Sequence, residues 1–215
     1  MVLKKCKNVF IDCGTNLGQG FEHFDKKYNF DSSWEIILFE PNPWLFNHIK
    51  KEVIEANKHL NISAYPIAIC GANALPEVEF LMQNIPEYDA PIGGGSTVVS
   101  SDILHDEETE GYEKCIVKTV KLSTIIRGIG EPYMRINPEG LGHLAKNECK
   151  IVVKLDIEGE EYDVIEDLLN TSVAWWIHSL HVEFHGRRFK EDKRADEVRL
   201  IGELFQCGVV CFPHH

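Results

Sequence analysis

The stretch Val9-Phe10-Ile11-Asp12-Cys13-Gly14-Thr15-Asn16-Leu17-Gly18-Gln19-Gly20 decides the fold of this chain. Its first three residues are β-branched or aromatic, a pattern typical of a strand buried on both faces. Gly14 and Gly18 then bracket a turn, and an apolar spacing typical of a helix follows. Glycines let the backbone approach a ligand closely, and the first turn of a helix offers unpaired N–H groups. The stretch therefore predicts a strand–turn–helix unit that holds a ligand.

Two acidic residues indicate the kind of ligand. Asp12 precedes the first glycine, so the pattern is D-x-G-x-x-x-G and differs from the G-x-G-x-x-G that binds pyrophosphate. A carboxylate there would repel a diphosphate and attract an ammonium or a sulfonium group. Glu40 follows the apolar run 34–39, where a carboxylate could accept hydrogen bonds from both hydroxyls of a ribose. Together the two acids predict an adenosine-type ligand that carries a positive charge.

Composition limits the class of function. The 215 residues suit one α/β domain, so we expect a single domain over residues 1–215. The net charge of −12, without a long Lys/Arg run, argues against nucleic acid or an anionic membrane as a partner. No apolar run approaches the roughly 18 residues that span a bilayer, and no signal-peptide core follows Met1. We therefore expect a small-molecule or carbohydrate acceptor that is neutral or cationic.

The cysteines predict the compartment. There are seven, an odd number, and they lack paired C-x-x-C spacing. Most lie in or beside apolar runs, which is typical of small reduced core residues. The chain is therefore expected to be cytoplasmic, without a disulfide framework or a zinc site. The six cysteines in or beside apolar runs are Cys6, Cys13, Cys70, Cys149, Cys207 and Cys211.

Strand and helix patterns alternate along most of the chain. Such repeated units predict an α/β fold with a mostly parallel sheet, right-handed crossovers and helices on both faces. Asn42 is the expected N-cap of the second helix and Pro43 its first residue. The last helix is expected to use Val198, Ile201 and Phe205 as its apolar face. The expected strands are 9–11, 34–39, 61–70, 150–156, 177–185 and 208–212, and the first two helices are 17–28 and 43–56.

The alternation breaks in an irregular insertion at about residues 71–148. Strands are expected near 78–82 and 115–122, whereas 127–146 could be irregular surface or a short helix. The glycine-rich segment 91–97 is favoured as a flexible connector. The alternative is a loop that folds over the site, with Ser96 or its neighbours touching the ligand and excluding water.

Polar residues mark the carboxyl ends of two later strands. Because side chains alternate along a strand, Lys154, Asp156 and Glu158 are expected on one face, with Asp156 at the strand end. The next strand would place Glu183 and His185 on one side, together with His181. These residues are expected to deliver carboxylates and imidazoles to one edge of the sheet. A simpler alternative is that Lys154 and Glu183 only form an ion pair.

Four motifs together resemble the FkbM family of S-adenosylmethionine-dependent methyltransferases. They are D-C-G-T-N-L-G, F-E-P-N-P, K-L-D-I-E-G-E-E and V-E-F-H, and they extend over most of the chain. The resemblance implies a class I methyltransferase (Rossmann-like) fold and methylation of a hydroxyl, commonly on a sugar or a natural product. One departure is visible: the family sheet ends in an antiparallel strand pair, and this chain stops near its first member.

The resemblance also implies residue roles. The methionine part of the donor would lie against the glycine loop, the ribose against Glu40, and the adenine between Ala68 and Ile69. Asp156 and Glu158 would face the methyl group and the acceptor. With the strand pattern added, the expected cofactor-binding set is Asp12, Gly14, Thr15, Asn16, Gly18, Glu40, Pro41, Ala68, Ile69 and Asp156, and the expected catalytic set is Asp156, Glu158, Glu183 and His185.

Several alternatives stay open at this point. The expected base for the acceptor hydroxyl is His185 or Asp156. Glu158, Glu183 and His185 could instead hold a divalent cation, magnesium or manganese, but metal-free catalysis is favoured and no metal ligand is assigned. An NAD-dependent oxidoreductase would share the glycine loop and the distant acid. In a non-catalytic nucleoside-binding module, Asp12 and Glu40 would bind the ligand, and Asp156 and His185 would have no catalytic role.

Overall fold

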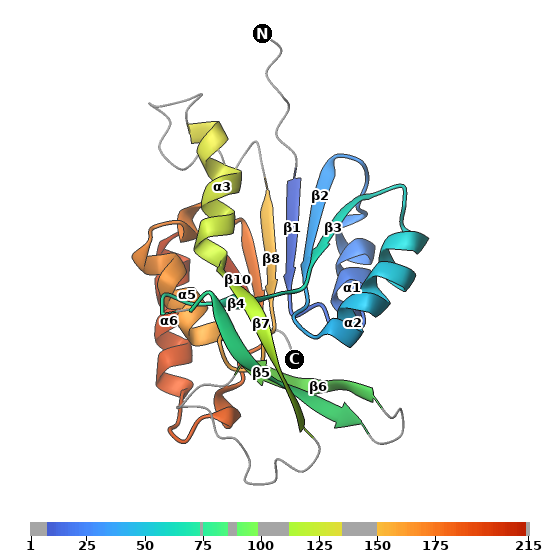
Figure 1. The fold of residues 1–215 in the computed structure, drawn as a ribbon. Coiled ribbons are helices and arrows are strands. Elements are labelled where there is room, and N and C mark those ends of the chain that lie inside the picture. Colours follow the sequence, from blue (N-terminus) through green and yellow to red (C-terminus); the bar gives the residue numbers. More distant parts are fainter. Residues whose placement is uncertain (1–7, 74, 86–89, 99–111, 135–149, 214–215) are drawn as a thin grey trace.

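A computed structural model describes residues 8–73, 75–85, 90–98, 112–134 and 150–213. Two sheets and the helices around them make up these residues (Figure 1). Several expectations lie outside the described residues, namely those on Cys6, on Cys149 and on 135–146.

The main sheet has six strands in the order β10-β9-β8-β1-β2-β3, and every neighbouring pair is parallel. This arrangement confirms the predicted α/β class and its Rossmann-like sheet. At the edge, β10 pairs with β9 in parallel, so within the described residues this sheet has no antiparallel strand. The strands are β1 (Asn8–Cys13), β2 (Trp34–Phe39), β3 (Asn61–Tyr65), β8 (Ile151–Leu155), β9 (Ser179–Val182) and β10 (Val210–Pro213).

Helices cover both faces of this sheet (Figure 1). On one face, Phe10 of β1 packs with Phe21 and Phe24 of α1 in a largely aromatic core. On the other face, Ile11 and Val153 pack with residues of α5 and α6. Asn42 caps α2 as predicted, because its side chain accepts hydrogen bonds from the first turn and Pro43 follows it. The helices are α1 (Gln19–Tyr28), α2 (Pro43–His48) continued by the π-helix η1 (Ile49–Ile54), α3 (Leu122–Met134), α5 (Glu161–Asn170) and α6 (Arg194–Gln206), with 3₁₀ turns η3 (Ala174–Trp176) and η4 (Gly186–Arg188).

The second sheet has the order β4-β7-β5-β6 and is built from the insertion. The predicted strand 61–70 is in fact divided at Pro66 between the two sheets: β3 belongs to the first and β4 to the second. Proline has no N–H for a strand ladder, which explains the break. The strands are β4 (Ile67–Cys70), β5 (Glu77–Ile85), β6 (Ala90–Val98) and β7 (Tyr112–Lys121).

The glycine-rich segment is part of strand β6, so the favoured interpretation as a flexible connector was wrong. It pairs with β5 in an antiparallel ladder that contains irregularities. Figure 1 shows β5 and β6 beyond the carboxyl ends of the main sheet, where the insertion can cover a ligand site. The unassigned stretch after Arg127 begins as helix, since α3 extends to Met134.

Two local predictions need correction. Strand β9 ends at Val182, so Glu183 and His185 follow the strand and His181 alone lies within it. His181 is buried against the rings of Phe24 and Phe212, away from the polar cluster that His185 joins. On α6 the buried residues are Leu200 and Leu204, whereas Val198 and Phe205 are exposed.

The described cysteines are free thiols. Cys13 and Cys70 are buried, as expected for reduced core residues, and burial raises the pKa of Cys70 to about 12. Among the described residues, no helix combines the length and apolar character that a bilayer crossing requires. The other free cysteines are Cys115, Cys207 and Cys211.

Candidate active site

The loop between β1 and α1 joins three strand ends. The N–H groups of Gly14 and Thr15 donate to the Phe39 carbonyl at 3.0 and 3.1 Å, and Asp156 N donates to the Cys13 carbonyl at 3.1 Å. Gly14 has φ +79°, and a Cβ at this position would overlap the Asp156 carbonyl oxygen. Glycine is therefore required where the ends of β1, β2 and β8 meet.

Glu40 lies at the centre of this junction with only 5% of its surface exposed. Its Oε2 accepts from Asn16 N at 2.8 Å and its Oε1 from Asn42 N at 2.9 Å. A carboxylate has about four acceptor positions, so each oxygen keeps capacity for one more donor. Burial raises the pKa of Glu40 to about 7, although the two backbone N–H groups oppose the shift.

An open cavity lies beside Glu40, at the carboxyl ends of the strands of the main sheet. One wall is polar and holds Gly14, Asn16, Glu40 and Asp156. The second sheet also contributes lining residues, among them Phe80, Ser96 and Val98. The remaining lining residues are Phe39, Pro41, Leu45, Ile67, Ala68, Ile69, Ile157 and Glu158.

A second, more polar groove also borders the glycine loop. It shares Gly14, Asn16 and Asp156 with the first cavity, and it extends to Lys154. Because the two cavities meet at these three residues, a long ligand could cross the loop and occupy both. The other lining residues are Thr15, Gln19, Gly20 and His23.

Asp12 does not line either cavity. Its side chain is 0% exposed and forms a buried ion pair with Lys154, whose Nζ lies 3.3 Å from Asp12 Oδ1 and 3.0 Å from Asp156 Oδ2. Burial alone would lower the pKa of Lys154, but the carboxylates of Asp12 and Asp156 outweigh it and raise the pKa. The charge of Asp12 is therefore balanced inside the protein, which the sequence interpretation did not anticipate. Direct contact of Asp12 with a ligand stays a prediction.

Lys154 thus pairs with Asp12 and Asp156, and the simple Lys154–Glu183 pair is not what the structure shows. Lys154 Nζ also donates to the Gly14 carbonyl at 2.9 Å. A Cβ on Gly20 would come within 2.8 Å of the Lys154 side chain and 3.0 Å of Asp12 Oδ2. The sequence interpretation gave Gly20 no role, but the absence of a side chain at this position leaves room for the Asp12–Lys154 ion pair.

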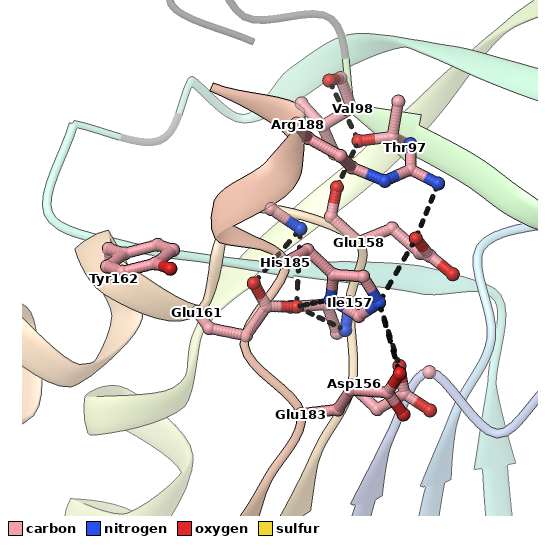
Figure 2. A network of polar contacts seen from close by, with 12 residues as sticks. Thr97, Val98, Asp156, Ile157, Glu158, Glu161, Tyr162, Glu183, His185 and Arg188 are labelled. Carbon is pink, nitrogen blue, oxygen red and sulfur yellow. Dashed lines mark hydrogen bonds and ion pairs between the residues drawn. The ribbon is translucent and has the colours of Figure 1, made fainter. Parts of the chain in front are cut away.

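His185 brings the predicted catalytic carboxylates together (Figure 2). Its side chain is 2% exposed, and its Nε2 lies 3.3 Å from Glu158 Oε2, 3.7 Å from Glu183 Oε1 and 3.8 Å from Asp156 Oδ1. Burial lowers the pKa of His185, but hydrogen bonding to Glu161 and the nearby carboxylates raise it overall. The four predicted catalytic residues therefore form one cluster at the ends of β8 and β9.

Glu161 holds this cluster in place and was missed as a functional residue. It is fully buried, and its carboxylate accepts from His185 Nδ1 at 2.9 Å and from Ile157 N at 2.9 Å. The N–H of Gly159 also donates to it. Glu161 is the last residue of the K-x-D-x-E-G-x-E motif, so the signal was present in the sequence.

Glu158 has two further contacts outside the cluster. Arg188 Nη2 lies 2.5 Å from Glu158 Oε2, and Thr97 Oγ1 of β6 donates to the Glu158 carbonyl at 2.9 Å (Figure 2). Burial raises the pKa of the Glu158 carboxyl, while His185 and Arg188 oppose the shift. The second sheet is therefore hydrogen-bonded to the segment that carries the cluster.

Most of the implied cofactor-binding residues line the cavities. Thr15 lines the polar groove, and Asp12 and Gly18 line neither. Gly18 has φ +99° and faces Val53 of η1, so its position indicates helix packing. No structural observation tests the binding roles themselves, which stay predictions. The implied residues that line the first cavity are Gly14, Asn16, Glu40, Pro41, Ala68, Ile69 and Asp156.

A parallel α/β sheet whose glycine loop and buried acid border a cavity at its strand ends is typical of proteins that bind a nucleoside-containing ligand. The family model described as "Methyltransferase FkbM domain" matches residues 12–209. The chain therefore belongs to the FkbM methyltransferase family. No curated protein and no solved structure matched the chain in the same comparisons.

Proposed function

We propose that this chain is an S-adenosylmethionine-dependent methyltransferase that methylates a hydroxyl on a sugar, a glycan or a small natural product. The observation that carries the proposal is Glu40, whose two buried oxygens border the cavity and each keep acceptor capacity. Two adjacent ribose hydroxyls would supply the missing donors. Membership of the FkbM methyltransferase family favours a methyl donor over a nicotinamide nucleotide.

The residues present fit such a donor. Ala68 and Ile69 would border the adenine, in the apolar part of the cavity, and Glu40 would hold the ribose. The methionine part would extend past Gly14 toward the polar groove, which shares Asn16 and Asp156 with the cavity. The donor supplies a methyl group on a positively charged sulfur.

In the proposed reaction, the acceptor oxygen forms a bond to the methyl carbon while the sulfur–methyl bond breaks. The bonding pair stays on sulfur, which gives the neutral S-adenosylhomocysteine, and the hydroxyl proton passes to a base. Alignment of the acceptor oxygen, methyl carbon and sulfur would supply most of the rate. Asp156 is the better base of the two residues proposed from the sequence, because it lines both cavities and its side chain is 27% exposed, whereas His185 is buried.

Calorimetric titration with S-adenosylhomocysteine and with NADH tests the donor, and transfer of a labelled methyl group to a panel of hydroxylated acceptors tests the reaction. We expect S-adenosylhomocysteine to bind and NADH not to bind. Tight NADH binding alone would contradict the proposal. Donor binding without turnover on the whole panel would instead favour the non-catalytic module. The cytoplasmic location and an acceptor other than nucleic acid or membrane also stay predictions.

The ribose contact predicts a pH dependence of nucleoside binding. Ribose hydroxyls donate hydrogen bonds, so they stabilise the ionised form of Glu40, whose pKa is about 7 in the free protein. Methylthioadenosine, which has the ribose but no amino acid, should therefore bind about tenfold more tightly at pH 8 than at pH 6. The same raised pKa means that the contribution of Glu40 to the free energy of unfolding falls as pH rises from 4.5 to about 7.

Two variants separate Glu40 from other titrating groups. Glu40→Gln should bind methylthioadenosine weakly and with a nearly constant dissociation constant across this range. Glu160→Gln is the matched control, because burial also raises the pKa of Glu160 to about 7 but Glu160 does not line the cavity. It should keep the wild-type pH profile. A flat profile in the wild-type protein would contradict the ribose contact.

A further inference from the structure

Within the part of the chain that the structure describes, the imidazole of His185 has one nitrogen with a hydrogen-bond partner and one that faces carboxylates. Glu161 accepts a hydrogen bond from Nδ1 at 2.9 Å, which places the proton of the neutral ring on Nδ1 and the lone pair on Nε2. Around Nε2, the described neighbours are the carboxylate oxygens of Glu158, Glu183 and Asp156, at 3.3 to 3.8 Å. Carboxylates are also acceptors, so in the neutral ring this lone pair would face other lone pairs, and either a proton or a metal ion on Nε2 removes that repulsion.

The cluster carries more negative than positive charge. The carboxylates connected through these ion pairs are Asp12, Asp156, Glu158, Glu161 and Glu183. The permanent cations paired with them are Lys154 and Arg188. A sulfonium donor would add only one further positive charge. The centre of the cluster therefore favours an additional cation.

The geometry points to a divalent cation site formed by Nε2 of His185 and the carboxylates of Asp156, Glu158 and Glu183. Donor atoms of Asp156, Glu158 and His185 lie within 4.8 Å of one another. In an octahedral site with bonds of about 2.1 Å, neighbouring donors are about 3 Å apart and opposite donors about 4.2 Å apart. His185 Nε2 lies 3.3 Å from Glu158 Oε2 and 3.8 Å from Asp156 Oδ1, close to these values, and Glu183 Oε1 lies 3.7 Å from the same nitrogen.

Glu161 supplies the supporting contact that such a site requires. A histidine that ligates a metal usually donates its other ring N–H to a carboxylate, which fixes the tautomer and the ring orientation. Glu161 makes this contact and is itself held by the N–H groups of Ile157 and Gly159. His185 is thus oriented with its lone pair toward the three carboxylates.

Manganese is the ion that this donor set fits best. Carboxylate oxygens suit magnesium, calcium and manganese, whereas an imidazole nitrogen favours the transition metals. Asp156 and Glu158 also line the main cavity, so the ion would lie at its edge. There it would lower the pKa of an acceptor hydroxyl, a role that rests on the proposed function, and it would reverse our sequence-based preference for metal-free catalysis. Ion binding itself does not depend on that function.

A titration with MnCl₂ tests the site. The full chain is stripped of metal with a chelator and desalted, and the electron paramagnetic resonance signal of free Mn²⁺ then measures the bound fraction. We expect one ion per chain. Glu183→Gln should weaken binding by about tenfold or more. Arg188→Gln should tighten binding, because it removes the cation that pairs with Glu158 at 2.5 Å. The matched control is Glu166→Gln, which removes an exposed acid of α5 that pairs with Arg199 of α6, and this variant should bind as the wild type does.

Asp156→Asn provides a second ligand variant, and circular dichroism shows whether each variant folds. Less than one equivalent of bound Mn²⁺, or wild-type affinity in both folded ligand variants, would overturn the site. A parallel titration with S-adenosylhomocysteine separates this inference from the proposed function. Donor binding without Mn²⁺ binding overturns the metal site alone, whereas Mn²⁺ binding without donor binding supports the site and contradicts the proposed donor.

Discussion

Replacement of Gly14 by alanine is expected to abolish binding of S-adenosylhomocysteine and to lower the free energy of unfolding by about 3 kcal/mol or more. Gly14 has φ +79°, which strains any residue with a Cβ, and the new methyl would overlap the Asp156 carbonyl oxygen. That oxygen belongs to rigid backbone, so the loop or the end of β8 must move. Either movement displaces Asn16 or Asp156 from the cavity wall. Urea denaturation and calorimetry measure the two effects.

Gly202→Ala is the control for Gly14→Ala. Gly202 lies within α6, and nothing lies within 4 Å of a Cβ built there. Because alanine is the better helix former, this variant should gain up to about 1 kcal/mol in free energy of unfolding and keep donor binding. If Gly14→Ala keeps wild-type stability and affinity, the close approach of the loop to Asp156 is not needed for the site.

The strands of the main sheet could be predicted because each is a short apolar run that ends at a polar or glycine residue. The runs 9–11 and 34–39 became β1 and β2, and Asn42 was identified as an N-cap from its place before Pro43. These signals are local in sequence. The division of 61–70 at Pro66 was missed, although a proline inside a strand pattern is also a local signal.

The buried face of α6 shows where periodicity alone fails. Val198, Ile201 and Phe205 have helical spacing, and so do Leu200 and Leu204. Only packing against the sheet decides between two stripes on one helix. The sheet buried the leucines and left Val198 and Phe205 exposed.

In the candidate site, the position of each acid along the chain could be predicted but its partner could not. Asp156 was expected at the end of its strand and directly follows β8, whereas Glu183 was expected within a strand and follows the end of β9. Lys154 was expected on the same face as Asp156, but its choice of Asp12 depends on the register between β1 and β8, which places Asp12 opposite Lys154. The contact between Glu161 and His185 likewise joins residues from two segments, and only the fold brings them together.

Replacement of Lys154 by methionine is expected to cost about 3 to 5 kcal/mol in free energy of unfolding. Methionine keeps much of the side-chain length, so packing against Gly20 is largely preserved. The buried Asp12 carboxylate, however, would lose its cation. Asp156 would lose the same partner at the edge of both cavities, so donor affinity should fall as well. Urea denaturation measures the free energy of unfolding, and calorimetry measures the affinity for S-adenosylhomocysteine.

The double variant Asp12→Asn/Lys154→Met separates lost charge pairing from lost packing. With both charges removed, no buried carboxylate is left without its cation at position 12, so the double variant should be more stable than Lys154→Met alone. Acid should also partly restore Lys154→Met, because protonation neutralises Asp12, whereas the double variant should gain less from the same change in pH. Equal losses in the single and double variants, with the same pH dependence, would show that Lys154 acts through packing. In that case steric packing would fix the position of the glycine loop, and the Asp12–Lys154 ion pair would contribute little to the free energy of unfolding.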